Sequence, residues 1–306
     1  MQPIEIRYPI YTVDQVELFA PGAVVSEEAL DDLITRRPKP VPQPRPLLDF
    51  ETTRADIRRL FDTPQYRIVF SDAKRNRQVM DLLEKVELIP PVLASLDYFR
   101  VLDKYTYRHI LLVMMLSALL AQELLEASFD QVVEAMNGPM HDIGKICVPL
   151  EILQKTSPLN MEERRRLEHH TVAGYVLLGY YLRDPRGLAA VVARDHHERR
   201  DGSGYPRGIH LKDPLVEIIV ACDVFDALIS ERPYRPQSYD IRTALEVLVG
   251  MAERGALDSR VVRALVSFNR QSHPHYKDCE LSHERRGSPP SNNLYSLRSD
   301  DDASRN

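Results

Sequence analysis

The sequence predicts a mainly α-helical protein, with a helical bundle in its larger C-terminal part and a small mixed α/β domain before it. From about residue 93 onward, apolar residues recur with the spacing of helices. Residues 105–127 are apolar on nearly all sides, which is typical of a helix at the centre of a core. The first 37 residues instead contain short β-like runs separated by turn residues. A chain of 306 residues can bury such a core without disulfides.

The N-terminal part divides into three predicted segments. Residues 1–37 form a strand-rich segment with the runs IEIRYPI, VELF and AVV. Residues 38–46 carry proline at every second position, which favours an extended polyproline form and predicts a semi-rigid linker. Residues 47–92 complete an N-terminal regulatory region, in which YRIVF at 66–70 is a candidate strand and residues 72–89 are a candidate amphipathic helix.

Residues 93–271 are predicted to form one helical domain, and residues 272–306 a polar, disordered tail. Acidic residues suit the first turn of one helix, and Pro185 and Pro214 suit the starts of two others. Besides the central helix, we expect helices over residues 161–182, 185–197 and 214–230 and within 238–254 and 258–270.

Composition excludes several classes of protein. The net charge of −5 at pH 7 argues against a general affinity for DNA or anionic membranes. The three cysteines are scattered and odd in number, which fits a reducing compartment. The N-terminus has no signal-peptide pattern, and the most apolar stretch, residues 109–122, is too short to span a bilayer. We therefore expect a cytoplasmic protein with no DNA or membrane partner.

Histidine and carboxylate residues recur through the predicted helical domain. A lone histidine on an apolar face is usually a hydrogen-bonded core residue, but a carboxylate such as Asp223 in an apolar helix needs a partner or a metal. Imidazole and carboxylate in this proportion suit a first-row divalent metal, and their number exceeds what one ion can use. The sequence therefore predicts a binuclear metal site. Its candidate ligands are His109, His141, Asp142, His170, His196, His197 and Asp223.

The order of these residues resembles a known family. His109, the His141-Asp142 pair and Asp223 follow one another as in the HD-domain metal phosphohydrolases. HDIGK is shared by many of these enzymes, but HHERRDGSGYP at 196–206 and DVFDALISERPYR at 223–235 look like the HD-GYP subfamily. That subfamily comprises bacterial phosphodiesterases that degrade cyclic di-GMP. The resemblance covers roughly residues 93–270 and implies an HD-type helical bundle.

The resemblance implies a division of the ligands between two ions. One ion would take His109, His141, Asp142 and Asp223, and the other His170, His196 and His197, with Asp142 bridging both. A carboxylate can bridge ions about 3.5–4 Å apart, and a water between them would be the nucleophile. Iron is the first expectation, with manganese, nickel, cobalt or zinc as alternatives. Some members bind a third metal through a glutamate that is replaced here by Tyr105, so two ions are expected.

The resemblance also implies residues that act on the substrate. Lys145 would meet a substrate phosphate and, with Asp142, is a catalytic candidate, whereas a structural reading makes it a solvated surface lysine. Arg232 and Arg235 would contact the phosphates of the dinucleotide, because guanidinium matches phosphate oxygens. Tyr205 would stack on or hydrogen-bond the substrate. Asp226 is either a contact with the substrate or metal site, or an ordinary helix-surface acid.

Three functions are consistent with these residues. The first is a metal-dependent phosphodiesterase that opens cyclic di-GMP to linear pGpG, with either pGpG or GMP as the final product. The second is a catalytically weak dinucleotide-binding adaptor that docks to diguanylate cyclase domains through the GYP loop. The third is an HD phosphohydrolase that acts on another nucleotide. Metal-dependent turnover would separate an enzyme from an adaptor, and a homodimer is compatible with all three functions.

Overall fold

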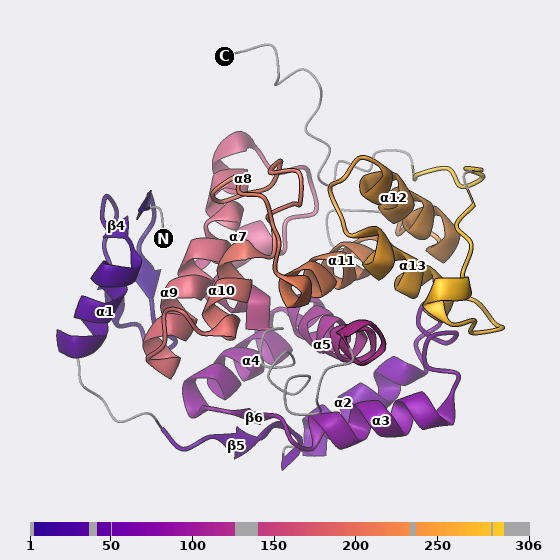
Figure 1. The fold of residues 1–306 in the computed structure, drawn as a ribbon. Coiled ribbons are helices and arrows are strands. Elements are labelled where there is room, and N and C mark those ends of the chain that lie inside the picture. Colours follow the sequence, from indigo (N-terminus) through magenta and orange to yellow (C-terminus); the bar gives the residue numbers. More distant parts are fainter. Residues whose placement is uncertain are drawn as a thin grey trace, which may run out of the picture.

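A computed structural model describes residues 3–36, 42–49, 51–125, 140–232, 237–282 and 284–290. The protein is mainly α-helical, as the sequence predicts, and its strands form only two-stranded pairs among these residues. The central helix α5 (Lys104–Leu125) packs against α4 (Pro90–Leu102) and α11 (Pro214–Ile229), and Figure 1 shows it in the middle of the protein.

The N-terminal segment contains the predicted short strands. Strand β1 (Ile4–Glu5) pairs antiparallel with β4 (Val24–Val25), and β2 (Ile10–Tyr11) pairs with β3 (Glu17–Phe19). The sequence reading missed the helix α1 (Glu27–Arg36) that follows them. This helix buries Leu30 and Ile34 and packs on α9 (His170–Leu182), so it joins the strand-rich segment to the bundle.

The next region differs from its prediction. Part of the proline-rich segment is paired, because β5 (Arg45–Pro46) forms an antiparallel ladder with β6 (Glu87–Leu88); residues 37–41 lie outside the described residues. A short η1 (Leu47–Asp49) leads into α2 (Glu51–Phe61), which was not predicted. The candidate helix at 72–89 is confirmed in its first part as α3 (Ala73–Leu83), but its end is wrong, because residues 87–88 form strand β6.

The candidate strand YRIVF is wrong, because residues 66–70 form consecutive turns. The amide of Tyr66 donates to the carbonyl of Thr63 at 2.9 Å, and the amide of Phe70 donates to the carbonyl of Tyr66 at 3.0 Å. These local bonds use the backbone groups that a strand would offer to a neighbour. Val69 and Phe70 are nevertheless buried, so the apolar pattern predicted burial correctly but not the backbone conformation.

The bundle contains most of the predicted helices. Its remaining elements are η2 (Met140–Cys147), α7 (Leu150–Leu153), α8 (Met161–Glu168), α10 (Leu188–Asp195), α12 (Ile241–Glu253), α13 (Ser259–Phe268) and η3 (Tyr276–Asp278). The helix expected over 161–182 is divided into α8 and α9 at His169, where the exposed first half meets the buried second half. The helix expected from Pro185 begins only at Leu188, after Gly187 at its N-cap.

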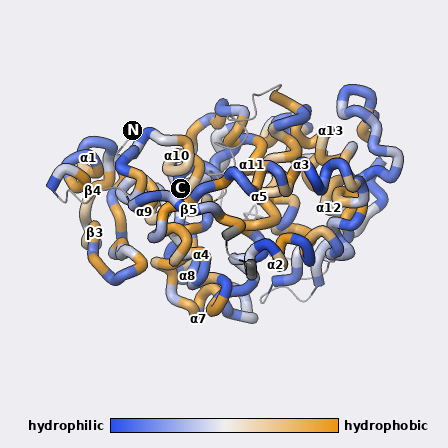
Figure 2. Tube along the Cα trace, turned by 90° about the horizontal axis from the view of Figure 1, so that it is seen from below, coloured by the Kyte–Doolittle hydropathy of each residue, from blue (hydrophilic) through white to orange (hydrophobic). Residues whose placement is uncertain are grey.

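Helix α5 is longer than the apolar stretch at 109–122, which was predicted to be too short to span a bilayer. It has 22 residues and is long and apolar enough to cross a bilayer by length and composition, but 72% of its most apolar window is buried inside the protein. Figure 2 shows this hydrophobic helix surrounded by other parts of the chain. A buried helix of this kind is typical of a core.

The tail is ordered over part of its predicted disordered length. Cys279 is buried, and the amides of Arg286 and Gly287 donate to the carboxylate of Glu246 on α12. The segment 273–282 and 284–290 therefore belongs to the folded structure, and residues 291–306 lie outside the described residues.

Candidate metal centre

The structure brings all the predicted metal ligands together at the middle of the bundle. His109 comes from α5, Asp223 from α11 and His170 from the first position of α9. His196 follows α10 as its C-cap, with His197 next to it. The pair His141-Asp142 lies on η2, which packs against both α9 and α10. Five segments that are distant in sequence thus meet at one buried site.

One group of donor atoms lies between α5, η2 and α11. Nε2 of His109 lies 3.1 Å from Oδ1 of Asp223 and 3.2 Å from Nε2 of His141. One ligand atom from each of these three residues lies within 4.8 Å of the others, so they could hold a metal ion. All three side chains are buried.

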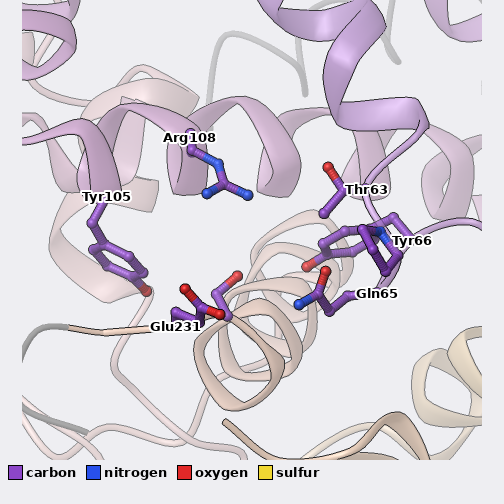
Figure 3. Close-up of a pocket in the computed structure, with 8 residues that line it drawn as sticks. Thr63, Gln65, Tyr66, Tyr105, Arg108 and Glu231 are labelled. Atoms are coloured by element: carbon purple, nitrogen blue, oxygen red, sulfur yellow. The ribbon is translucent and has the colours of Figure 1, made fainter. Parts of the chain in front are cut away.

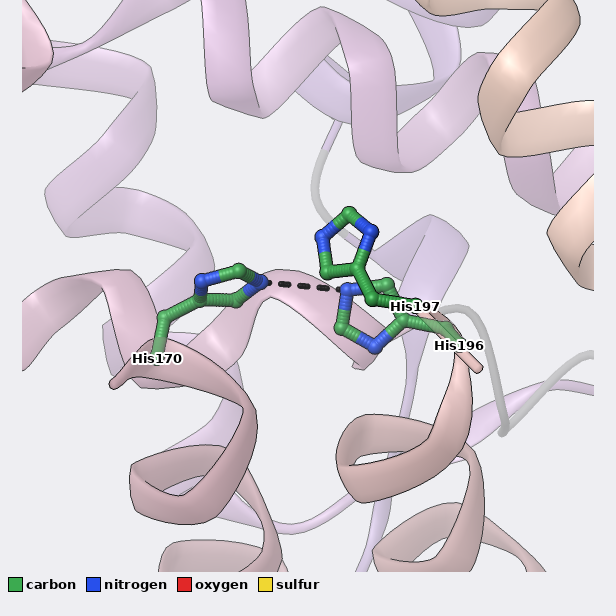
Figure 4. Close-up of side chains that lie close together, drawn as sticks. All are labelled: His170, His196 and His197. Carbon is green, nitrogen blue, oxygen red and sulfur yellow. Dashed lines mark hydrogen bonds between the residues drawn. The ribbon is translucent and has the colours of Figure 1, made fainter. Parts of the chain in front are cut away.

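A second group lies at the ends of α9 and α10. Nε2 of His170 lies 3.1 Å from Nε2 of His196, and Figure 4 shows these rings edge to edge with His197 beside them. Ligand atoms of His170, His196 and His197 also lie within 4.8 Å of one another. Adjacent imidazoles without a cation between them gain nothing from such proximity, so the donor set fits a metal.

Asp142 lies between the two groups. Its Oδ2 is 3.5 Å from Nε2 of both His109 and His141. Its Oδ1 is 3.4 Å from Nε2 of His170 and 3.9 Å from Nε2 of His196. Each carboxylate oxygen therefore faces a different group, which is the arrangement that a bridging carboxylate requires.

Backbone carbonyls orient two of the imidazoles. Nδ1 of His170 donates to the carbonyl of Leu167 at 2.5 Å, and Nδ1 of His196 donates to the carbonyl of Ala193 at 2.9 Å. With the proton held on Nδ1, the lone pair of Nε2 points into the cluster. Such hydrogen bonds fix both the tautomer and the ring orientation of a metal-binding histidine.

A carboxylate orients His109 in the same way. Nδ1 of His109 donates to Oδ2 of Asp226 at 2.5 Å. Oδ1 of Asp226 accepts hydrogen bonds from the hydroxyls of Tyr66 and Ser230, the latter at 2.8 Å. Asp226 is fully buried, so these contacts favour a role beside the metal site over a surface role. The sequence reading missed Tyr66, because it lies outside the recognised motifs.

Burial keeps several of these histidines neutral. It lowers the pKa of His141 and His196 to about 4 and that of His170 to about 3. The pKa of His197 is also well below its usual value, first because of burial and then because of the neighbouring His196. Neutral imidazole is the form that binds metals, so the site holds these ligands ready at neutral pH.

The carboxylates carry the negative charge of the site. Burial alone would raise the pKa of Asp142, but Lys145 and the surrounding histidines hold it well below the usual range. Burial would also raise the pKa of Asp223, but its hydrogen bond to His109 and the charges of the surrounding histidines together hold it low. Burial would lower the pKa of His109, yet its hydrogen bonds to Asp223 and Asp226 raise it to about 9.

The GYP loop, which contains Gly204, Tyr205 and Pro206, packs against the histidine pair. The ring of Tyr205 stacks on that of His197, with centroids 4.6 Å apart, and its amide donates to the carbonyl of the same histidine at 3.2 Å. A Cβ at Gly204 would lie 2.4 Å from Cα of Glu198, so only glycine allows this close approach. The loop therefore forms a wall of the site at His197.

Glu198 and Asp195 hold the far side of this loop. The buried carboxylate of Glu198 accepts the amides of Arg207 and Ile209 at 2.7 and 3.1 Å. Arg207 also reaches back to both oxygens of Asp195, at 2.7 and 2.8 Å. These contacts fix the loop around the histidines and account for the acids on either side of the pair.

Lys145 and Arg232, two of the predicted substrate residues, lie at the same centre. Nζ of Lys145 is 2.6 Å from Oδ2 of Asp142, one turn along η2. The guanidinium of Arg232 lies over the ring of Tyr105 at 4.9 Å, and that ring stacks on His109 with centroids 5.7 Å apart. Arg235 lies outside the described residues.

A pocket of about 290 Å³ adjoins the site at Tyr66 and Tyr105. Its lining residues come from the α2–α3 connection, from α5 and from the end of α11: Thr63, Pro64, Gln65, Tyr66, Tyr105, Arg108, Ser230 and Glu231. Figure 3 shows Arg108 and Glu231 on facing walls. Tyr105 and Tyr66 separate the pocket from His109 and Asp226, which they contact.

These features agree with the comparisons to known proteins. The HD domain profile matches residues 97–261, more than half of the chain. The site defines a helical protein with a histidine–carboxylate metal centre, and the chain belongs to the HD domain family and, within it, to the HD-GYP group.

Three curated relatives illustrate this similarity. A cyclic di-GMP phosphodiesterase of Thermotoga maritima is 39% identical over 47% of this chain and 39% of its own length. One of Pseudomonas aeruginosa is 35% identical over 65% of this chain and 50% of its own length. A 3'3'-cGAMP-specific phosphodiesterase of Vibrio cholerae is 35% identical over 55% and 39%. The chain thus spans half or less of these relatives' lengths.

Proposed function

We propose that this protein is a metal-dependent phosphodiesterase that opens cyclic di-GMP to linear pGpG, with either pGpG or GMP as the final product. The observation that carries the proposal is the position of Asp142, whose two oxygens face two separate groups of buried donors. The names of the relatives from Thermotoga and Pseudomonas support cyclic di-GMP as the substrate.

The donor set fits two divalent ions. His109, His141, Asp142 and Asp223 would hold one ion, and His170, His196 and His197 the other, with Asp142 shared. Iron is our first expectation, and manganese, nickel, cobalt and zinc also suit imidazole and carboxylate. When bound, such ions polarise phosphoryl oxygens and lower the pKa of water toward about 7.

The chain's own residues would bind and orient the phosphodiester. Lys145 carries its ammonium into the centre beside Asp142, where a phosphate oxygen can replace part of that ion pair. Arg232, held against Tyr105, and Arg235 would hold a phosphate through their planar guanidinium groups. Tyr205 would contact the substrate from the loop side while its ring supports His197.

A second candidate substrate is 3'3'-cGAMP. The relative from Vibrio cholerae is named for it and has the same 35% identity to this chain as the relative from Pseudomonas, over a smaller share of the chain. Both molecules present the same pair of phosphodiesters to the site. An adaptor without turnover, docked to diguanylate cyclase domains through the GYP loop, is the remaining alternative.

The deciding experiment measures hydrolysis of both cyclic dinucleotides by protein that is chelated and then reloaded with Fe(II) or Mn(II) under anaerobic conditions. We expect metal-dependent production of pGpG from cyclic di-GMP. Faster cleavage of 3'3'-cGAMP would transfer the assignment to that substrate. Binding of cyclic di-GMP without turnover by the loaded protein would favour the adaptor.

We also propose a cytoplasmic location. Cys147, Cys222 and Cys279 are free thiols, and two of them are buried. Reduced cysteines are typical of proteins in a reducing compartment. Fractionation of cells that express the chain, followed by detection in the cytosolic and membrane fractions, tests this location.

A further inference from the structure

A tyrosine from the N-terminal region contacts the carboxylate that hydrogen-bonds one of the candidate metal ligands. Tyr66 lies between α2 and α3, before the stretch 97–261 that matches the HD domain family. Its side chain is buried, with only 1% of its surface exposed, and its hydroxyl donates to Oδ1 of Asp226 on α11. The hydrogen bond therefore joins a segment outside the family match to the core of the site.

The surroundings of Tyr66 hold its hydroxyl in this position. Its ring meets Phe225 edge to face, with centroids 6.3 Å apart, and packs on Phe70 at 6.2 Å. Its backbone amide and carbonyl are bonded to Thr63 and Phe70. With both backbone and ring fixed, the hydroxyl has Asp226 as its partner, and Figure 3 shows the ring pointing toward the end of α11.

Asp226 transmits this position to a metal ligand. Its second oxygen, Oδ2, accepts Nδ1–H of His109 at 2.5 Å, and Nε2 of that histidine lies 3.1 Å from Asp223. Outer partners of this kind fix the orientation and basicity of a metal-binding histidine, and their removal typically costs about 10–100-fold in metal affinity. In the other group, His170 and His196 are oriented by backbone carbonyls instead of by Asp226.

We infer that Tyr66 is a positioning residue of the metal centre: through Asp226 it fixes the imidazole of His109, so that the N-terminal region is part of the site. This inference rests on the metal site of the proposed function. It predicts that one of the two metal affinities depends on a residue outside the HD domain match.

The test compares Tyr66→Phe with Tyr107→Phe. Tyr107 is a matched control, because its hydroxyl also joins the N-terminal region to α5, through Asp56 at 3.1 Å, but does not touch Asp226. Each change removes one buried hydroxyl from the same interface. Mn(II) is titrated into chelated protein, and free Mn(II) is measured by electron paramagnetic resonance, which gives the affinity of each site.

We expect Tyr66→Phe to weaken one of two Mn(II) sites by about 10–100-fold, and Tyr107→Phe to leave both affinities within about twofold of the parent. Ser230→Ala, which removes the other hydroxyl from Oδ1 of Asp226, should weaken the same site. Melting curves in chelator show whether each variant is folded. If Tyr66→Phe fails to fold, Ser230→Ala decides whether the donors to Asp226 matter.

Two results would overturn the role of Tyr66: parental affinities in Tyr66→Phe, or equal losses in Tyr66→Phe and Tyr107→Phe, which would make the contact only structural. A parent protein that binds no Mn(II) would refute the metal site itself, and with it this role. Parental metal binding without phosphodiesterase activity would refute the proposed reaction and leave the role of Tyr66 intact.

Discussion

At the scale of single residues, the site depends on how one carboxylate is shared. Asp142 is buried among histidines from three directions, and its charge is balanced by Lys145 at 2.6 Å. A carboxylate with both oxygens directed at different donor groups cannot be replaced by two independent ligands. The residue should therefore control both metals together.

We predict that Asp142→Ala loses both metals and all measurable turnover. Metal content per chain, measured after gel filtration, should fall from about two to near zero, since two-metal sites share their bridging ligand. Asp258→Ala is the control, because that buried acid caps α13 and lies outside the cluster. The control should lose stability by about 0.5–2 kcal/mol and keep its metals. Retention of both metals in Asp142→Ala would contradict the bridging role.

Lys145 and Arg232 should act on phosphate instead of metal. Lys145→Ala should keep its metal content while kcat falls about 10²–10³-fold, because a donor to the developing phosphoryl charge is removed. Arg232→Ala should mainly raise KM, and Arg232→Lys should recover only part of the affinity, since lysine lacks the planar fork. Loss of metal from Lys145→Ala would instead assign that lysine to the support of Asp142.

The sequence predicted the buried cluster because most of its residues stand out from their immediate sequence neighbours. His141-Asp142 and His196-His197 are adjacent pairs, and Asp223 stands out in an apolar helix. Tyr66 leaves no such sign. One tyrosine in an apolar run reads as core, and only the fold brings its hydroxyl to Asp226, 160 residues away.

At the scale of elements, helices with a continuous apolar face or an aspartate cap were predictable, and α1 and α2 were not. Helices α5 and α11 have continuous apolar faces, and α12 and α13 begin at aspartate caps. Segments α1 and α2 are short and largely polar, and their helicity depends on packing against the bundle. The turns at 66–70 reflect the same dependence on tertiary contacts.

The contact of η2 with α9 gives a prediction at this scale. A Cβ on Gly144 would lie 1.9 Å from the carbonyl oxygen of His170 and 2.4 Å from the amide nitrogen of Gly174. Gly144→Ala must therefore push η2 away from α9, at a cost of about 1–3 kcal/mol or more in the free energy of unfolding. Because Asp142 and His170 lie on these two elements, metal affinity should fall as well.

Gly250→Ala is the matched control for this change. Gly250 lies inside α12, and the nearest atom to its added Cβ is the flexible end of Arg254 at 3.4 Å. Alanine there should stabilise the protein by up to about 1 kcal/mol through helix propensity. Urea unfolding of both variants measures the two effects, and a Gly144→Ala variant as stable as the parent would show that η2 can move freely.

At the scale of the whole molecule, the protein buries an unusual set of histidines and carboxylates at its centre. Neutral histidines and ionised carboxylates are buried together, and the helices of the bundle position them. The sequence could indicate the ligands, but the protonation states follow from burial, which only the assembled fold provides. The stability of the chelated protein should therefore depend on pH in a characteristic way.

We predict that chelated protein is most stable near pH 6.5. His141, His170 and His196 have pKa values of about 3–4 when folded but about 6.5 when unfolded, so the unfolded chain binds more protons between these values. Stability must then fall as pH drops below about 6.5, by about 1.4 kcal/mol per pH unit for each histidine. His109 has the opposite sign: its pKa of about 9 means that its contribution is lost as pH rises from about 6.5 to 9.

Urea unfolding of chelated protein between pH 4.5 and 9 measures this profile. Replacing His196 by glutamine should reduce the acid-side slope by about one proton, because one neutral buried imidazole no longer takes up a proton on unfolding. Bound metal competes with protons for the same nitrogen atoms, so loaded protein should keep its stability to lower pH than chelated protein does. A chelated protein whose stability is unchanged between pH 7 and 5 would show that these histidines take up protons equally in the folded and unfolded chains, which would contradict their lowered pKa values.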